Sequence, residues 1–142
     1  MQKAVLALMC VCMAALGAEN IHAAPNDAGS TTGWTDDSIN QSLAEEFAKC
    51  AAFSGIAAGC ARKGAQARPD TAAAAEYEEA AKRFYKGSYL LAGQEFTRGR
   101  IHSHDTAQRR IAGNACEGFP KLEQQCRKHC DDTAKRLPHK AR

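Results

Sequence analysis

Three residues near the carboxyl end of the chain form its densest group of reactive side chains: Cys126, His129 and Cys130. At positions i, i+3 and i+4 they would share one face of a helix. Thiolates and imidazoles at that spacing suit Zn²⁺ or copper, and His102 and His104 are further possible ligands. The competing interpretation is a disulfide-bonded cysteine beside a solvent-facing histidine. Because a structural zinc site needs four ligands, metal binding is the alternative hypothesis, and we expect no resident cofactor.

Catalytic patterns are absent from the sequence. There is no Gly-x-Ser-x-Gly motif and no glycine-rich loop that could hold a phosphate. Carboxylates occur in adjacent pairs, but neighbouring helical positions diverge by about 100°. Such pairs predict solvated helix edges rather than acid–base sites, and they lie at 36–37, 45–46, 78–79 and 131–132. We therefore predict that the protein is not an enzyme.

The cysteines predict crosslinks. Beyond residue 23 the chain has five: Cys50, Cys60, Cys116, Cys126 and Cys130. Cys50 and Cys60 are ten positions apart, as are Cys116 and Cys126. On antiparallel segments this spacing would allow Cys50–Cys126 with Cys60–Cys116. The alternative is a local Cys116–Cys126 bond, with Cys50 or Cys60 joined to Cys130. Either way we expect two disulfides and one remaining thiol.

The amino-terminal 23 residues have the pattern of a cleaved secretory signal peptide. Lys3 precedes an apolar run over 4–17, and small residues follow at Ala18 and Ala23. The run is shorter than the roughly 20 residues that span a bilayer, so we expect no membrane span. Residues 24–33 are polar and predict a flexible linker. These features predict a periplasmic or secreted protein, in an oxidising compartment where disulfides persist.

Composition beyond the predicted signal peptide favours helices. Residues 24–142 contain no valine and no methionine, and alanine supplies 23 of the 119 positions. Sheets favour β-branched residues, whereas alanine is the best helix former. We expect an all-α fold, a small alanine-rich bundle of about four helices stabilised by disulfides.

Apolar spacing and helix-end signals locate these helices. The first has Trp34 and Thr35 at its start, includes Ile39 in its apolar stripe and ends at Gly64. The second begins at 69–71 and ends near Gly99; it is apolar on two sides, so we expect it at the centre. The third starts at 103–105 and carries Ile111. The fourth runs over 120–137 and is followed by a basic tail, 139–142, so the helical domain spans 34–138.

Two pairs of residues are candidates for partner binding: Tyr85 with Tyr89, and Arg109 with Arg110. The tyrosines are one helical turn apart and could form a recognition patch, although the shortage of other large side chains favours a place in the core. The two arginines belong to a carboxyl-terminal half in which basic residues dominate. This half could meet an anionic surface, while an exported protein is not expected to bind nucleic acid.

The sequence thus favours an exported helical binding or accessory protein. It would act through contacts with another protein, as an inhibitor, an immunity-type factor or a secretion accessory factor does. No motif identifies that partner.

Overall fold

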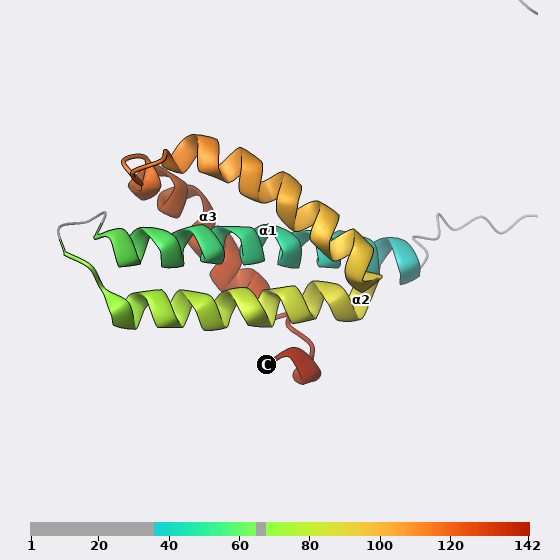
Figure 1. Cartoon of the computed structure of the whole chain (residues 1–142). Coiled ribbons are helices and arrows are strands. Elements are labelled where there is room, and N and C mark those ends of the chain that lie inside the picture. Colours follow the sequence, from blue (N-terminus) through green and yellow to red (C-terminus); the bar gives the residue numbers. More distant parts are fainter. Residues whose placement is uncertain (1–35, 65–67) are drawn as a thin grey trace, which may run out of the picture. The chain divides into compact units, whose positions relative to one another are not determined.

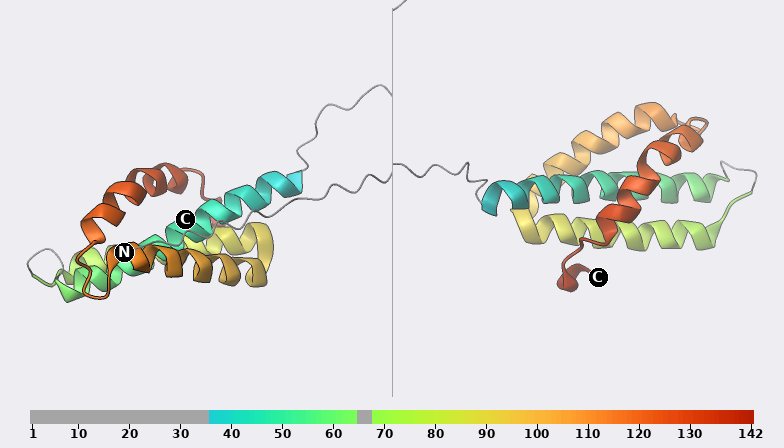
Figure 2. Two further views of the ribbon diagram at one scale, coloured as in Figure 1. Left: turned by 90° about the horizontal axis from the view of Figure 1, so that it is seen from above. Right: turned by 180° about the vertical axis from the view of Figure 1, so that it is seen from behind.

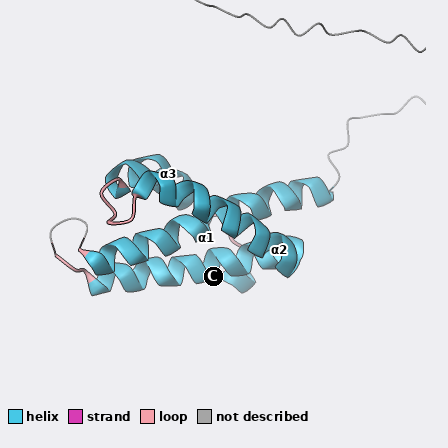
Figure 3. Cartoon of the chain, turned by 45° about the horizontal axis from the view of Figure 1, so that its top comes forward, coloured by secondary structure: helices cyan, strands magenta, loops and turns pink. Residues whose placement is uncertain are grey.

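The computed structural model describes residues 36–64 and 68–142, in which every regular element is a helix (Figure 3). α1 spans Asp36–Lys63, α2 spans Thr71–Ala112 and α3 spans Phe119–Ala134. A short 3-10 helix, η1, follows at His139–Ala141. The described residues form no strand, which confirms the all-helical bundle. The α-helices number three in this part of the chain rather than the four expected.

α1 is the central helix. Acidic residues occupy its first turn and basic residues its last, where each sign suits the helix dipole. The helix ends as predicted at Gly64, whose φ of +72° is the left-handed conformation that glycine adopts after a helix. Between Ala44 and Cys60 most residues are buried, because α2 and α3 cover different sides of α1 (Figures 1 and 2). The prediction that the second helix is central was wrong.

α2 reverses direction at Gly93, where φ is 80° and ψ is 176° (Figure 1). It therefore consists of a first limb, residues 71–92, and a second limb, residues 94–112. The predicted end near Gly99 and the predicted helix start at Ser103 were wrong, since both lie inside the second limb. Glycine alone reaches the dihedral angles of Gly93 at low cost, so the chain turns there.

Two buried hydroxyls close this reversal. The Thr97 hydroxyl donates to the carbonyl oxygen of Gly93 at 2.8 Å. Its oxygen lies 3.0 Å from the Ser88 hydroxyl, which is left to donate to it. Ser88 and Thr97 are both fully buried, so the bond joins the two limbs where water cannot compete.

The first limb of α2 lies unusually close to its neighbours at Gly87. A Cβ atom on this residue would lie 2.7 Å from Cδ2 of Leu137 and 3.0 Å from Cδ2 of Phe47. The absence of a side chain at Gly87 therefore allows the helices to approach closely here.

α3 begins after a tight turn and crosses α1 and the first limb of α2 on the side that faces the viewer in Figure 2, right. Gly113 and Cys116 in this turn have φ of 76° and 64°. Pro120 occupies the first turn of α3, as expected for a residue without an amide proton. The helix ends at Ala134 rather than at Leu137. Residues 139–142, predicted as a basic tail, include η1 and the buried Ala141.

Two disulfides join α1 to the carboxyl-terminal part of the chain. Cys50 is bonded to Cys130 of α3, with Cα atoms 5.5 Å apart. Cys60 is bonded to Cys116 in the turn before α3, with Cα atoms 5.6 Å apart. Cys126 is a buried free thiol. Two bonds and one thiol were predicted, and each predicted set was right in one bond: Cys60–Cys116 belonged to the first set and Cys50–Cys130 to the alternative. The predicted bonds of Cys126 were wrong, because α3 crosses α1 obliquely and meets Cys50 at Cys130, one turn beyond Cys126.

Aromatic rings fill much of the core. Phe53 packs edge-on against Tyr77 and stacks on Phe119, with ring centroids 6.2 and 6.4 Å apart. Phe47 lies 6.3 Å from Phe84. Alanines of α1 lie around these rings, so a few large side chains suffice to fill the space between closely packed helices.

Some residues assigned to apolar stripes are exposed instead. Ile39 is 50% exposed and Ile111 is 38% exposed. The amino-terminal end of α1, which carries Ile39, extends beyond the reversal of α2 (Figure 1). These two positions were wrongly expected in the core, because spacing alone does not say where the neighbouring helix ends.

Other predictions fall outside the described residues. These are the signal peptide over 1–23, the linker over 24–33, and the helix start at Trp34 and Thr35. Within the described ranges, no helix combines the length and apolarity needed to cross a bilayer.

Candidate functional site

The candidate site is a groove between the two limbs of α2. It has a volume of about 350 Å³ and is mostly apolar; we call it the α2 groove, and it is lined by Ala51, Ala81, Lys82, Tyr85 and Ile101. Tyr85 lies eight residues before Gly93 and Ile101 eight residues after it. The reversal therefore sets these two side chains level on opposite limbs, while α1 supplies Ala51 between them.

Two tyrosines extend this surface along the first limb. The rings of Tyr85 and Tyr89 stack with centroids 6.5 Å apart and planes 10° apart. Tyr85 is half-buried, whereas Tyr89 is 46% exposed. The expectation that these tyrosines belong to the core was therefore wrong for Tyr89. A stacked pair with one ring in water presents a large rigid surface at low entropic cost.

Basic side chains border the tyrosine pair. Lys82 lines the α2 groove and pairs with Glu79 at 2.7 Å. Lys86 is exposed one turn farther on and makes no ion pair among residues 36–64 and 68–142. Helical residues three and four apart are neighbours, so Lys82, Lys86 and Tyr89 share one edge of the limb.

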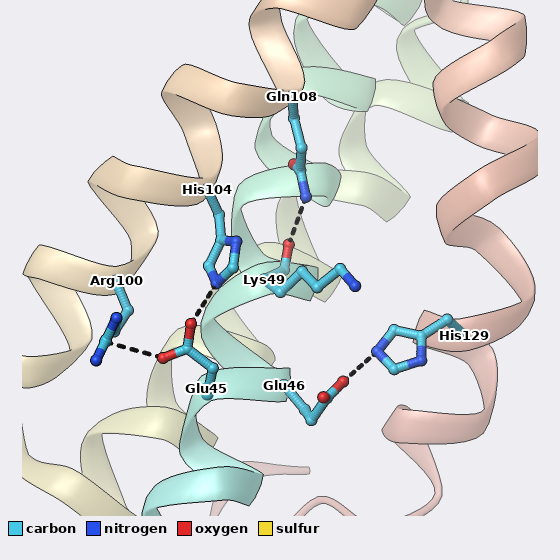
Figure 4. A network of polar contacts seen from close by, with 7 residues as sticks. All are labelled: Glu45, Glu46, Lys49, Arg100, His104, Gln108 and His129. Carbon is cyan, nitrogen blue, oxygen red and sulfur yellow. Dashed lines mark hydrogen bonds and ion pairs between the residues drawn. The ribbon is translucent and has the colours of Figure 1, made fainter. Parts of the chain in front are cut away.

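A polar network fixes the second limb against α1 (Figure 4). Glu45 pairs with His104 at 2.7 Å through one carboxylate oxygen and with Arg100 at 2.9 Å through the other. The buried Gln108 donates from Nε2 to the carbonyl oxygen of Lys49 at 3.2 Å. Arg100 also lies 5.4 Å above the ring of Phe96. These contacts hold in place the limb that carries Ile101.

The neighbouring Glu46 contacts α3 and not the second limb of α2. It pairs with His129 of that helix, on a different side of α1 from Glu45 (Figure 4). The two glutamates were expected at a solvated edge. They are half-buried, and because adjacent positions diverge by about 100° each holds a different helix.

The structure does not assemble the predicted metal site. The sulfur of Cys130 is bonded to Cys50, His129 faces Glu46, and Cys126 is buried in the core. His102 is exposed and His104 is paired with Glu45. Within the described part of the chain, no group of three or more histidine, cysteine or acidic side chains is arranged to hold a metal ion.

The Cys126 thiol is shielded from reaction. Burial raises the pKa of this thiol, and the positive charge of Lys49 offsets the effect only in part. The thiolate is the reactive form, so a raised pKa makes Cys126 a poor nucleophile near neutral pH.

The predicted arginine pair lies away from the tyrosines. Arg109 and Arg110 are about 12 Å farther along the second limb than Ile101, at about 1.5 Å per residue. Arg109 pairs with Asp105 at 2.7 Å and lines a separate cavity of about 180 Å³ beside the Cys60–Cys116 bond. The four predicted partner-binding residues thus fall in two places, of which only the tyrosine pair adjoins the α2 groove.

Sequence reasoning missed Ala51, Lys82 and Ile101 as residues of this site. Spacing along one helix cannot pair residues on opposite limbs. The usable signal was Gly93, because residues equally distant from a reversal lie opposite each other.

No family model, no curated protein and no solved structure matches the chain.

Proposed function

We propose that this is an exported helical binding protein that docks on a partner protein through the α2 groove and the stacked tyrosines beside it. The observation that carries the proposal is the Tyr85–Tyr89 stack, with Tyr89 46% exposed at the edge of an apolar groove. Tyrosine is enriched at protein interfaces because its ring supplies apolar area and its hydroxyl remains hydrated.

The chemistry of the surface favours a partner segment with an apolar anchor and acidic neighbours. An aliphatic side chain would fill the space between Tyr85 and Ile101. Carboxylates on either side of that aliphatic side chain would form ion pairs with Lys86 and Lys82. Lys82 would first give up its ion pair with Glu79. Charges at the rim would speed and orient docking more than they would strengthen it.

A preformed surface supports this role. The Gly93 reversal, the Ser88–Thr97 bond and the Glu45 network all fix the limbs before any partner arrives. Rigidity lowers the entropic cost of association. Two disulfides in the described residues agree with action in the periplasm or outside the cell, as an inhibitor, immunity-type factor or secretion accessory factor.

Site-specific photocrosslinking in the native exported fraction tests the proposal. A benzophenone side chain at Tyr89 should capture one partner protein. The same group at Ile111, an exposed apolar residue near the far end of the second limb, is the matched control and should capture none.

Substitution of Tyr89 is the second test of the docking surface. Tyr89→Ser should weaken binding of the captured partner at least tenfold and change the melting temperature little, because the ring is half in water. Capture of the same proteins from positions 89 and 111, or full affinity of the Tyr89→Ser variant, would exclude this docking face.

A further inference from the structure

A third cavity lies between the first limb of α2 and the end of the chain from Ala134 onward. Its volume is about 490 Å³, and it combines an apolar wall with basic side chains; we call it the basic cavity, lined by Ala80, Arg83, Phe84, Ala134, Lys135, Leu137 and Arg142. Sites for small molecules usually fall between about 300 and 1,000 Å³. None of the partner-binding or metal-binding residues predicted above lines it.

Every ionisable side chain lining this cavity is basic. Arg83 donates from Nε to the carbonyl oxygen of Glu79, at 3.4 Å. Arg142 donates from Nε to the carbonyl oxygen of Leu137 at 3.1 Å and from Nη2 to that of Lys135 at 3.0 Å. Carbonyl contacts orient these guanidinium groups, and neither group forms an ion pair with a side chain of the described residues, although the charge of Arg83 helps to lower the pKa of Glu79.

Lys135 differs from the two arginines because it has a carboxylate partner. It pairs with Asp132 at 2.7 Å, an exposed contact one turn back on the chain. An exposed pair of this kind contributes little to stability, so Asp132 is easily exchanged for another anion. The basic cavity therefore favours a negatively charged ligand.

The apolar wall is firmly held. Phe84 is 4% exposed and Leu137 is 6% exposed, and Leu137 packs into the space left by Gly87. A bare inorganic anion would leave this wall unused, and a neutral apolar molecule would leave the arginines unused. The ligand that uses both carries an anionic group on an apolar chain.

We propose that the basic cavity binds a small amphipathic carboxylate, such as a straight-chain fatty acid of medium length. The chain lies against Phe84 and Leu137. The carboxylate meets Arg83 and Arg142, whose planar donor pairs match its two oxygens. This inference does not depend on the proposed docking function, because no residue lines both sites.

Calorimetric titration of the exported chain with hexanoate, octanoate and decanoate, below their micelle concentrations, tests the proposal. We expect saturable binding of one ligand per chain. Affinity should rise about fourfold for each added CH₂ group while the wall still has room. The alkylammonium ion of equal length should bind at least tenfold more weakly than the carboxylate. Added salt should lower the affinity for the carboxylate, because it screens the charges.

Three variants place the site. Arg83→Gln should lower the affinity for decanoate about tenfold. Ala80→Leu should abolish binding, because the larger side chain would fill the space beside the apolar wall. Arg136→Gln removes the same charge next to Lys135, from an exposed residue that does not line the cavity, and should change nothing.

Several results would overturn the inference. They are the absence of saturable binding, equal affinity for the alkylammonium ion, equal loss in Arg136→Gln and Arg83→Gln, or unchanged affinity in Ala80→Leu. Melting temperatures show whether each variant is folded. If Ala80→Leu unfolds the protein, the comparison of Arg83→Gln with Arg136→Gln decides alone.

Discussion

α3 and the second limb of α2 both pack on α1, but they are held there by different means. A covalent bond, Cys50–Cys130, joins α3 to α1, and the Glu46–His129 pair lies beside it. The second limb of α2 is held along its length by the Glu45 and Gln108 contacts. The second limb itself carries no disulfide; the Cys60–Cys116 bond lies beyond its last residue, Ala112.

This difference follows from the area each segment can bury. α3 has 16 residues and crosses α1 obliquely, so it buries only a short stripe. Most of the stability of a helix in a protein comes from tertiary packing, and a disulfide compensates for a small packed area by restricting the unfolded chain. The second limb begins at a fixed reversal and follows α1 for longer, so polar contacts suffice. Crosslinks in an alanine-lined bundle stabilise the segments with the smallest interfaces.

The largest effect is expected from breaking the bond that holds α3. While Cys60–Cys116 is intact, the Cys50–Cys130 bond closes a loop that consists only of the ten positions from 50 to 60 and the fourteen from 116 to 130, and the loss of that closure should cost about 3.5 kcal/mol. The double variant Cys50→Ser, Cys130→Ser should therefore lose much of the protein's stability, measured by urea unfolding. Cys126→Ala is the control and should cost about 1 kcal/mol, as expected for a small buried side chain. Equal losses in the two variants would mean that α3 does not depend on its crosslink.

A smaller effect is expected at the reversal that defines the second limb. Gly93→Ala places a side chain at φ 80°, ψ 176° and should cost about 1–3 kcal/mol of backbone strain. A Cβ atom there meets nothing within 4 Å, so strain alone is tested. Gly99→Ala is the matched control: its Cβ is also unobstructed, but its backbone is helical, and it should stabilise the protein by about 0.5–1 kcal/mol. Thermal unfolding that moves both variants the same way would contradict the two-limb structure.

The smallest effect is expected from the polar contacts. Glu45→Gln weakens the contacts with both His104 and Arg100 and should cost about 1 kcal/mol. Glu46→Gln is the matched control, because it weakens one contact in a place where a disulfide already acts. Hydrogen exchange should show faster opening of residues 94–112 in Glu45→Gln, and little change in α3 in Glu46→Gln. The opposite pattern would show that the two segments are held alike.

Features set by local chemistry could be predicted from the sequence. The alanine content indicated helices, Gly64 and Pro120 marked helix ends, and the odd number of cysteines required an unpaired thiol. Each of these depends on one residue or on overall composition. None requires knowing where another helix lies.

Features that depend on helix crossing could not be predicted. Spacing made Cys126 as good a partner for α1 as Cys130, and the crossing angle of α3 decided between them. The α2 groove required two facts together, the reversal at Gly93 and the residues equally distant from it. Ser103, His104 and Asp105 resembled a helix start, yet they continue a helix whose turn had already occurred at Gly93.

The order of the cysteines along the chain has a consequence for its connectivity. Cys60–Cys116 lies wholly inside the loop closed by Cys50–Cys130, and all of α2 lies inside both. The two rings are nested rather than interlocked, so either bond can form first without threading the chain through a closed ring. A protease that cuts α2 once, anywhere along its length, releases no fragment. The two pieces remain one covalent molecule. The groove residues of the first limb and Ile101 of the second limb both stay attached to α1.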